Sequence, residues 1–550
     1  MSSASGLADG AVGGGASGDR LEATRWGTAD WLLLGLASAL GAALLFWRLG
    51  QGSLADWDEA TYAEIAREVY VFRDWIYLHW DFVPWYTKAP LYTWLTALLF
   101  HFDVSALVAR AVSAAAGVGT IAVTYALARR LYGRAVAVVS VLILAVCYEF
   151  VASSRFGTSD GLMTLFTYAS LYAFVRAEEG DRRWWYGVGV ATGLALMTKD
   201  FAALVGPIAI LLALALEGRL ATLAKREVWV GVALALIIAL PWNLLQLARY
   251  GGTFVSQYVG YMVVSRATNQ IEGHTGSAIT YFALARDQFF PWFYLLPFAG
   301  LAWIAQWWRD RRRPSIVAVF PALVFILYTL VKSKLSWYLV PIYPAAAVIV
   351  GGAAVRAMKG SGPMLAGLGL SVLAGILLVP NSLSPVPRAW TLALVVGLAV
   401  GAGAALWRRR SPAGPLAAVA LAFMLALAAN QLVPLYTLGQ SPSELLGARA
   451  RSQAQPGPIL LFIPTPADGP NDNVSHSLVF YSRRPVQVVI GLGQLQQGLG
   501  CARLVDVVIP AGQAPLLSGH VSFRPVLQES RFILGVAQER AGEIPNCPAA

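Results

Sequence analysis

The chain has little charge and almost no cysteine. Charged side chains make up 13% and apolar side chains 57% of its 550 residues, against about 25% and about 45–50% in soluble domains. A soluble fold cannot hide so much apolar surface, so this composition excludes a soluble globular protein and a disordered chain. Three cysteines provide neither a metal-binding knuckle nor a disulfide framework.

Several catalytic signatures are also missing. There is no Walker phosphate loop, so an ATP-driven pump lacks its parts. No two histidines have the helical spacing of a zinc site. The five histidines are scattered at His79, His101, His274, His476 and His520.

Long apolar runs fill the first 432 residues, and thirteen of them are long enough to cross about 30 Å of hydrocarbon as helices. Helices satisfy their own backbone hydrogen bonds in lipid, so the runs predict a polytopic α-helical membrane protein. The predicted spans are 31–49, 105–128, 135–152, 158–175, 185–199, 201–217, 228–247, 290–308, 315–331, 337–355, 363–380, 389–407 and 412–432.

The net charge of +11 comes from arginines and lysines between the apolar runs, which is a membrane pattern rather than a nucleic-acid footprint. Clusters of these residues occupy alternate connections. Because basic residues favour the cytoplasmic side, the pattern predicts a cytoplasmic N-terminus and an outer C-terminus. The clusters are Arg20/Arg25, Arg129/Arg130/Arg134, Arg176/Arg182/Arg183, Arg219/Lys225/Arg226, Arg309/Arg311/Arg312/Arg313, Arg356/Lys359 and Arg408/Arg409/Arg410.

Composition divides the chain into three parts. Residues 1–29 are rich in Gly, Ala and Ser and are predicted to be a disordered cytoplasmic N-terminus. Residues 30–432 form the predicted transmembrane domain, with long outer segments at 50–104 and 248–289. Residues 433–550 are predicted to be an α/β domain on the outer face.

Local signals support that last domain. Ser441-Pro442-Ser443-Glu444 has the pattern of a helix capping box with proline at the first helical position. Cys501 and Cys547 both lie in the domain, where a disulfide is permitted, and its presence stays open. Short β-like runs follow the capping box at 458–464, 478–481, 486–490, 504–509 and 531–536.

The outer segment 50–104 concentrates charged and aromatic residues. An amphipathic interfacial helix over Glu59–Val71 accounts for most of them. It does not account for Asp58 directly after the first span, nor for Lys88 before a proline, because charge beside lipid is costly. Asp56-Trp57-Asp58 also looks like the metal-binding D-x-D of nucleotide-sugar transferases, but nucleotide sugars are not available outside the membrane.

Further charged and aromatic residues stand at the outer ends of predicted spans. Snorkelling or pairing explains any one of them alone. Together they bring cations beside a few carboxylates, which suits a ligand with phosphate groups and a lipid tail. They are Arg155, Asp160, Lys199, Asp200, Arg266, Glu272, His274, Lys332, Lys334, Tyr338 and Tyr343.

These residues resemble the motifs of one family. Residues 58–68, DEATYAEIARE, are similar to the D-E-x-x-Y-A-E-I-A-R-E opening of the aminoarabinose transferase (ArnT) family. That family is a bacterial branch of the GT-C glycosyltransferases, related to protein O-mannosyltransferases. Thr61 stands where members often have Arg, and Ala89 replaces a Pro. Weaker similarities are Lys88-Ala89-Pro90, Arg155 with Asp160, Gly193–Lys199, His274 with Pro291-Trp292, and Lys334 with Tyr338 and Pro341.

The resemblance implies a GT-C fold and a specific reaction. The enzyme would move 4-amino-4-deoxy-L-arabinose from undecaprenyl phosphate to lipid A phosphates at the periplasmic face of the inner membrane, which confers resistance to polymyxin. It implies a monomer without cofactor or metal. The expected catalytic residues are Asp58, Lys88 and Asp160, and the expected substrate contacts are Glu59, Tyr62, Arg155, Arg266, His274, Lys334, Tyr338 and Tyr343.

The chemistry leaves alternatives open. A single inverting displacement is expected, with Lys88 stabilising the departing phosphate and helped by Arg266. A lipid A phosphate is already anionic, so Asp58 would orient substrate; an attacking hydroxyl would instead need Asp58 as general base. A protein O-mannosyltransferase-like enzyme is the alternative with the same chemistry. A polyprenyl-lipid transporter is the alternative from another class, although no internal repeat is visible.

Overall fold

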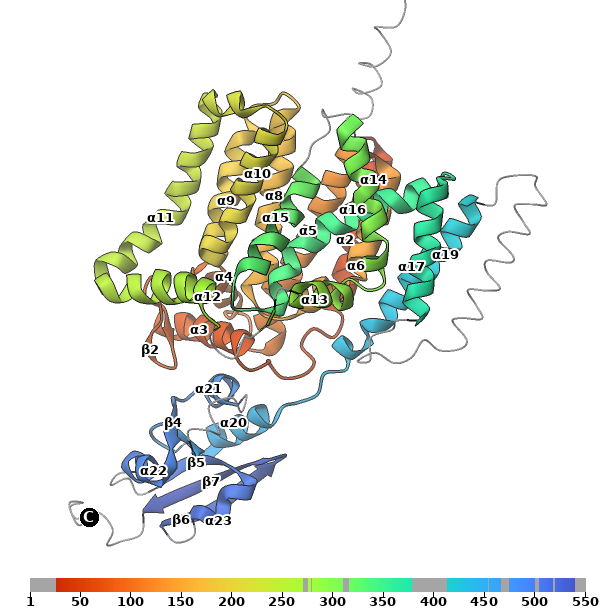
Figure 1. The fold of residues 1–550 in the computed structure, drawn as a ribbon. Coiled ribbons are helices and arrows are strands. Elements are labelled where there is room, and N and C mark those ends of the chain that lie inside the picture. Colours follow the sequence, from red (N-terminus) through yellow and green to blue (C-terminus); the bar gives the residue numbers. More distant parts are fainter. Residues whose placement is uncertain are drawn as a thin grey trace, which may run out of the picture.

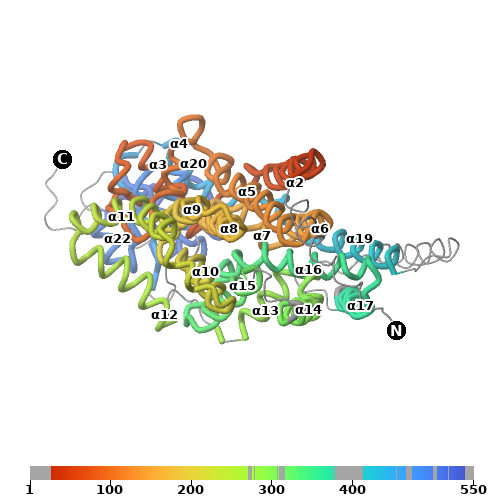
Figure 2. The backbone as a smooth tube through the Cα atoms, turned by 90° about the horizontal axis from the view of Figure 1, so that it is seen from above, coloured from red at the N-terminus to blue at the C-terminus, as the bar shows by residue number. Residues whose placement is uncertain are grey.

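A large helical body and a smaller sheet domain make up the protein in this computed structural model (Figure 1). The structure describes residues 26–270, 276–277, 279–309, 316–377, 413–453, 455–465, 474–499, 504–517 and 520–539. Seen from above, α5, α8, α9 and α11 are neighbours in one row (Figure 2). The helices of the body are α2 (Thr28–Phe46), α5 (Ala106–Tyr132), α6 (Arg134–Ala145), α7 (Tyr148–Arg155), α8 (Ser159–Glu178), α9 (Trp184–Lys199), α10 (Val205–Leu216), α11 (Arg226–Phe254), α12 (Arg266–Thr268), α13 (Thr280–Gln288), α14 (Leu296–Arg309), α15 (Ile316–Leu330), α16 (Tyr343–Met358), α17 (Gly362–Leu377) and α19 (Ala413–Gln431).

The helical membrane architecture predicted from the apolar runs is confirmed. Among the described residues, six helices are long and apolar enough to cross a membrane, or up to eight if each bent pair counts as one span. Twelve of the thirteen predicted spans coincide with helical segments, while 389–407 lies outside the described residues. Two details differ: the span at 135–152 bends by 64° between α6 and α7, and 185–199 and 201–217 run on as one helical stretch.

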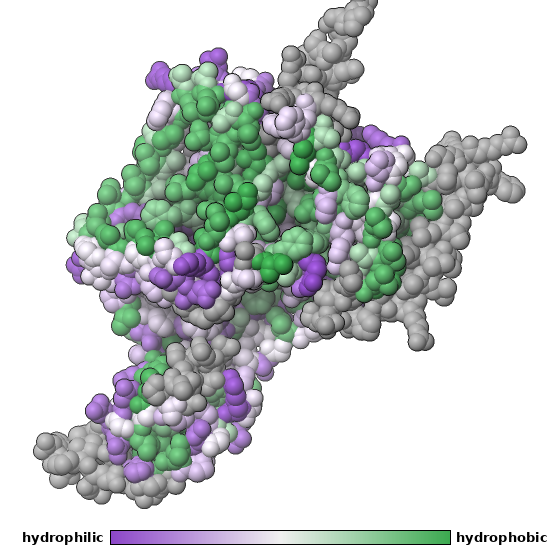
Figure 3. All heavy atoms as spheres, viewed as in Figure 1, coloured by the Kyte–Doolittle hydropathy of each residue, from purple (hydrophilic) through white to green (hydrophobic). Residues whose placement is uncertain are grey.

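Ion pairs bring three of the arginine clusters to one end of the helical body, and Arg130 of α5 pairs there with Glu179, which follows α8. Asp30 near the start of α2 accepts a hydrogen bond at 2.7 Å from Arg129, in the last turn of α5. Glu178 at the end of α8 pairs with Arg219, which follows α10. The connections after α5, α8 and α10 therefore share one end, as the charge pattern predicts. Figure 3 shows a broad hydrophobic surface over the helices between this end and the opposite, more polar one.

The opposite end carries the segment that follows α2. It contains α3 (Asp58–Phe72), a short β1–β2 hairpin (His79–Trp80 and Val83–Pro84) and α4 (Leu91–Leu99). The helix predicted over 59–71 is present, but its interpretation as an interfacial amphipathic helix is wrong. Residues 59–69 are all buried, because α4 packs on α3 and α21 of the C-terminal domain covers it. Its charges are satisfied inside the protein, for example by Arg67 donating to Glu64 at 2.8 Å.

The C-terminal domain is a five-stranded mixed sheet with strand order β4-β3-β5-β7-β6. β3 pairs in parallel with β4 and β5, while β7 is antiparallel to β5 and β6. All five residues of β3 are buried, so the sheet is covered on both faces. Its elements are α20 (Pro442–Gln453), β3 (Ile459–Ile463), α21 (Ser475–Ser482), β4 (Val486–Ile490), α22 (Gly491–Leu499), β5 (Val505–Pro510), α23 (Ala514–Leu517), β6 (Val521–Glu529) and β7 (Phe532–Glu539).

Most of the local predictions for this domain are confirmed. Helix α20 begins at Pro442, and the Glu444 amide donates to Ser441 Oγ at 3.4 Å. Four predicted strands match β3, β4, β5 and β7. The strand at 478–481 is wrong, since it lies in α21, and β6 was not predicted. A four-residue apolar run does not distinguish a buried helix turn from a strand. Cys501 and Cys547 lie outside the described residues.

Hydrogen bonds attach the C-terminal domain to the segment before and after α3. Asp56 accepts the Ser477 amide at 2.6 Å and the Ser477 hydroxyl at 2.8 Å. Asp81 accepts the Val486 amide at 3.0 Å. The Leu54 amide donates to the Tyr481 hydroxyl at 2.7 Å. The domain thus covers α3 and lies at the end of the body opposite the arginine clusters (Figure 1).

Candidate active site

Asp58 and Lys88 form an ion pair at the end of the helical body that carries the C-terminal domain. Asp58 is the first residue of α3, and Lys88 precedes α4. The Lys88 ammonium donates to Asp58 Oδ1 at 2.7 Å. The Asp58 side chain is 37% exposed and that of Lys88 is 18% exposed, so the pair remains open to a ligand. The two residues therefore share one environment, as the proposed chemistry requires.

Tyr62 connects this pair to a second one. Its ring lies 4.7 Å from the Lys88 ammonium, and its hydroxyl is 2.9 Å from Ser159 Oγ. The next residue, Asp160, is buried near the N-terminus of α8 and pairs with Lys199 at the C-terminus of α9. Two lysines and two carboxylates thus lie around one tyrosine.

Tyr338 and Arg266 lie near these two charged pairs. The Lys199 ammonium lies 5.8 Å from the centre of the Tyr338 ring, which is stacked on Tyr328 at 4.4 Å. The Ser333 amide donates to the carbonyl of Arg266 at 3.2 Å, so α12 adjoins the segment that carries Tyr338. The charge of Arg266 acts on both Asp58 and Lys88. Three cations therefore act at this end of the body.

The two partners hold each other in their charged forms. Burial opposes ionisation of Asp58, but the charge and hydrogen bond of Lys88 outweigh it and keep the pKa of that carboxyl below its usual range. Burial likewise opposes protonation of Lys88, and Asp58 reverses the balance, so the pKa of the ammonium lies above its usual value. The site is therefore a permanent carboxylate–ammonium pair at neutral pH.

Four of the residues predicted to contact substrate instead form hydrogen bonds with other parts of the protein. Glu59 accepts Arg110 Nε and the Gly157 amide, each at 2.7 Å. Arg155 donates to the carbonyl of Trp47 at 2.7 Å, at the end of α2, and lies 4.3 Å from the Tyr436 ring.

Lys334 and Tyr343 are the other two. The Lys334 ammonium donates to the carbonyls of Tyr328 and Thr329 at the end of α15, at 3.0 and 2.7 Å. The Tyr343 hydroxyl donates to Gln288 Oε1 at 2.5 Å. These contacts hold helices together around the site. His274, predicted as a further contact, lies outside the described residues.

The D-x-D pattern does not form one site. Asp56 points to Ser477 of the C-terminal domain, whereas Asp58 points to Lys88. No group of three or more His, Cys, Asp or Glu side chains suited to a metal ion occurs among the described residues. The two carboxylates of the pattern are thus committed to different partners.

Comparisons with known proteins show what the chain is similar to in sequence and fold. Residues 87–244 match the family model described as dolichyl-phosphate-mannose-protein mannosyltransferase. The chain is 28% identical over 432 residues to the undecaprenyl phosphate-alpha-4-amino-4-deoxy-L-arabinose arabinosyl transferase of Pseudomonas paraeruginosa, covering 71% of this chain and 76% of the relative. The crystal structure of ArnT from Cupriavidus metallidurans bound to undecaprenyl phosphate superposes with a TM-score of 0.73 at 21% identity, covering 93% and 98% of the two chains. The chain is thus similar to GT-C glycosyltransferases of the ArnT family.

A more remote GT-C enzyme has the same architecture. The mycobacterial arabinofuranosyltransferase AftD matches with a TM-score of 0.51 at 12% identity, over 95% of this chain and 40% of AftD. The likeness to the two solved structures is one of fold. The chain therefore shares its fold with enzymes that differ widely from it in sequence and size.

The candidate site contains residues that were not among the expected catalytic residues. Lys199 stands at the end of a long apolar run, and a charge at that position is a sequence signal for a functional residue. Its pairing with Asp160, 39 positions earlier in the chain, could not be predicted from the sequence. Arg110, within a predicted span, is 2% exposed and donates to Glu59 and to the carbonyl of Ser53 at 2.7 Å. Arg110 could have been singled out from the sequence because it is a charged residue inside an apolar run. Asp200, which accepts the Tyr258 hydroxyl, anchors the stretch that follows Lys199.

Proposed function

We propose that the chain transfers 4-amino-4-deoxy-L-arabinose from undecaprenyl phosphate to phosphate groups of lipid A, with Asp58 and Lys88 at the centre of the reaction. The observation that carries the proposal is the 2.7 Å Asp58–Lys88 ion pair at the end of the body that carries the C-terminal domain. Relatives named for this transfer and the fold shared with an undecaprenyl phosphate complex of ArnT support it. Lowered negative charge on lipid A would give resistance to polymyxin and other cationic peptides.

The proposed step is a single inverting displacement. An anionic oxygen of the lipid A phosphate attacks the anomeric carbon of the sugar and forms the new C–O bond. The C–O bond to undecaprenyl phosphate breaks, and its electron pair leaves with the phosphate, which departs as a dianion. No proton has to be removed from the acceptor. The Lys88 ammonium stabilises the charge that grows on the leaving phosphate, assisted by Arg266.

Asp58 has two tasks in this scheme. It keeps the Lys88 ammonium in place, as their ion pair suggests, and its exposed part faces the positive charge that develops on the sugar ring. Asp160 with Lys199 forms the second charged pair beside Tyr62. We assign Tyr62, Tyr338 and His274 to substrate contact, and Glu59, Arg155, Lys334 and Tyr343 to the supports of the site.

The setting is part of the proposal. With basic clusters on the cytoplasmic side, the Asp58–Lys88 end faces the periplasm of a bacterial inner membrane, and the domain of residues 433–550 lies there too. The transmembrane domain comprises residues 30–432 and follows a cytoplasmic terminus of residues 1–29. The enzyme acts as a monomer and needs no cofactor beyond its lipid donor.

Reconstitution of the purified chain tests the function. Liposomes containing aminoarabinosyl undecaprenyl phosphate and lipid A should yield modified lipid A and free undecaprenyl phosphate in equal amounts. A serine-containing peptide replaces lipid A in a parallel sample, since the matched family model is named for protein mannosyl transfer. Sugar on the peptide but not on lipid A would overturn the proposed acceptor. Movement of the donor lipid between leaflets without sugar transfer would favour a transporter instead.

A further inference from the structure

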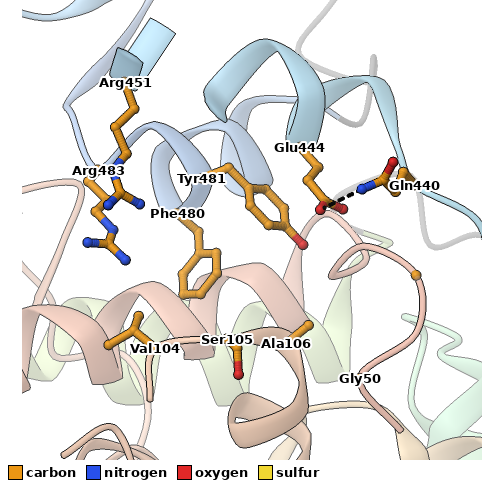
Figure 4. A pocket seen from close by; sticks show the side chains of 11 residues that line it. Gly50, Val104, Ser105, Ala106, Gln440, Glu444, Arg451, Phe480, Tyr481 and Arg483 are labelled. Carbon is orange, nitrogen blue, oxygen red and sulfur yellow. Dashed lines mark hydrogen bonds between the residues drawn. The ribbon is translucent and has the colours of Figure 1, made fainter. Parts of the chain in front are cut away.

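A cavity of about 340 Å³ lies between the helical body and the C-terminal domain, separate from the Asp58–Lys88 pair. The body contributes Gly50, Gly52 and residues 104–106, while the domain contributes residues of α20 and α21. Cavities of a few hundred Å³ suit small-molecule ligands. Figure 4 shows Arg451 and Arg483 at one end, Phe480 and Tyr481 in the middle, and Glu444 at the other end.

The two arginines face the cavity without a carboxylate partner. Among the residues that the structure describes, neither guanidinium has an acidic side chain within ion-pair distance. Arg451 and Arg483 line the same end of the cavity (Figure 4), and burial together with the charge of Arg451 lowers the pKa of Arg483. The charge of Arg67 also lowers this pKa, while the charges of Glu64 and Asp103 act in the opposite direction. An anion between the two guanidinium groups would be attracted by both.

The backbone fixes this arrangement. Arg483 ends α21 in a left-handed conformation with φ 58°, and its amide donates to the Val479 carbonyl at 2.9 Å. On the opposite wall, the 27-residue helix α5 begins at Ala106, and no side-chain hydrogen bond caps its N-terminus. That helix end lies on the wall below Tyr481 and Glu444, away from the two arginines (Figure 4). The positive charge at the first end of the cavity therefore comes from Arg451 and Arg483.

The other end of the cavity differs in chemistry. Tyr481 is anchored by the Leu54 amide, and Phe480 packs beside it at 5.3 Å. Glu444 accepts a hydrogen bond from Gln440 at 3.2 Å and one from Ser53. Aromatic side chains next to polar acceptors offer a surface for a sugar ring and partners for its hydroxyl or amino groups. The cavity therefore combines an anion-binding end with a sugar-binding end.

We propose that this interdomain cavity binds a phosphorylated sugar, with its phosphate between Arg451 and Arg483 and its ring toward Tyr481. Such a phosphate monoester is found on free sugar phosphates and on glycolipid headgroups. The two guanidinium groups select the phosphate, and Glu444 favours an amino sugar.

Binding to the purified full-length chain tests the site. Glucosamine 1-phosphate, titrated by calorimetry in low salt, should bind, whereas glucosamine should not. The double variant Arg451→Gln/Arg483→Gln should lose at least about tenfold in affinity, because charge-assisted contacts dominate phosphate recognition. Arg449→Gln on the same helix, exposed and outside the cavity, is the matched control and should bind like the parent. Equal binding by the double variant, or equal loss in Arg449→Gln, would overturn the proposal.

Two further experiments cover a variant that fails to fold and distinguish the two sources of the ligand. If the double variant fails to fold, the single Arg451→Gln variant takes its place, because Arg451 is exposed. Nanodiscs with bisphosphorylated lipid A then compete against the sugar phosphate. Displacement assigns the cavity to a lipid headgroup, and its absence assigns it to a free sugar phosphate. Asp58→Asn should leave this binding unchanged even where it abolishes transfer, so this site and the proposed function can fail independently.

Discussion

Lys88 illustrates how a single side chain is prepared for phosphate chemistry. Partial burial removes water that would otherwise screen its charge, while Asp58 at 2.7 Å prevents the loss of its proton. The Tyr62 ring, 4.7 Å away, adds a favourable contact with the cation. The ammonium is therefore charged and weakly screened before a substrate arrives, which is the condition for strong stabilisation of a leaving phosphate.

Replacement of Lys88 by glutamine should lower the turnover of the reconstituted enzyme about a hundredfold or more, since removing one charge-stabilising donor has effects of this size. The thermal unfolding midpoint should change little, because the pair is partly exposed. Lys359→Gln, at the exposed end of α16, is the control and should retain full turnover. Turnover of Lys88→Gln within twofold of the parent would remove Lys88 from the mechanism.

Asp81 provides a pH test outside the reaction centre. Burial raises the pKa of its carboxyl to about 6, despite the hydrogen bond from Val486. The folded protein thus binds a proton that the unfolded chain has already released, so this residue makes the protein less stable as the pH rises from about 4 to about 6. Asp81→Asn keeps a neutral acceptor, and asparagine tolerates the positive φ of 52° found there.

The thermal unfolding midpoint of Asp81→Asn should therefore match that of the parent at about pH 4 and exceed it at about pH 7. Differential scanning fluorimetry across this range measures both proteins. A constant difference between the two midpoints at every pH would show that the Asp81 carboxyl does not titrate in this interval.

Sequence reasoning reached the central pair but not its surroundings. Asp58 and Lys88 stand out because charge beside an apolar span needs a reason. Their contact depends on the fold, which brings positions 30 residues apart within 2.7 Å. Glu59 and Arg155 carry the same kind of signal, yet their partners are Arg110 and backbone carbonyls. Sequence alone cannot distinguish a charge that meets substrate from one that ties helices together.

At the level of the elements, α3 links the site to the outer domain. Its first residue belongs to the proposed reaction centre, and its buried length is covered by α4 and α21. The hydropathy pattern of α3 is the same whether lipid headgroups or another domain cover it, which explains why the interfacial interpretation failed. The thirteen apolar runs were more informative, because lipid imposes a minimum helix length that the sequence displays directly.

The attachment of the C-terminal domain should depend on Ser477. Ser477→Ala removes the 2.8 Å hydrogen bond to Asp56, whose side chain is only 6% exposed. A buried carboxylate that loses a donor should lower the stability of the protein by about 1–3 kcal/mol. Thermal unfolding and limited proteolysis at 433–441 measure the effect. Ser452→Ala, on the exposed surface of α20, is the control and should change neither the unfolding midpoint nor the rate of proteolysis. If Ser477→Ala also left both unchanged, other contacts would hold the domain.

The whole molecule is polarised along the direction of its helices. Arginine–carboxylate pairs lie at one end, and the lysine–carboxylate pairs of the site lie at the other. Lipid-linked substrates enter from the membrane plane, so a reaction centre at a helix end meets both the headgroups and the aqueous face. This polarity accounts for the alternation of charge in the sequence.

Cysteine labelling tests this orientation. In a variant with serine at Cys501 and Cys547, His520→Cys on the outer domain should react with a membrane-impermeant maleimide in intact spheroplasts. Arg182→Cys, exposed between α8 and α9, should react only after permeabilisation. Labelling of Arg182→Cys in intact spheroplasts would invert the orientation and place the Asp58–Lys88 end toward the cytoplasm.

The central claim is that Asp58 and Lys88 together transfer an amino sugar to lipid A. Mass spectrometry of lipid A tests this claim most directly. The lipid A comes from a host that makes the donor lipid but lacks its own aminoarabinose transferase. The parent chain and Lys359→Gln should add the sugar to lipid A phosphates. Asp58→Ala and Lys88→Ala, present in the membrane at normal levels, should leave lipid A unmodified. Full modification by either alanine variant, or none by the parent chain, would contradict the account.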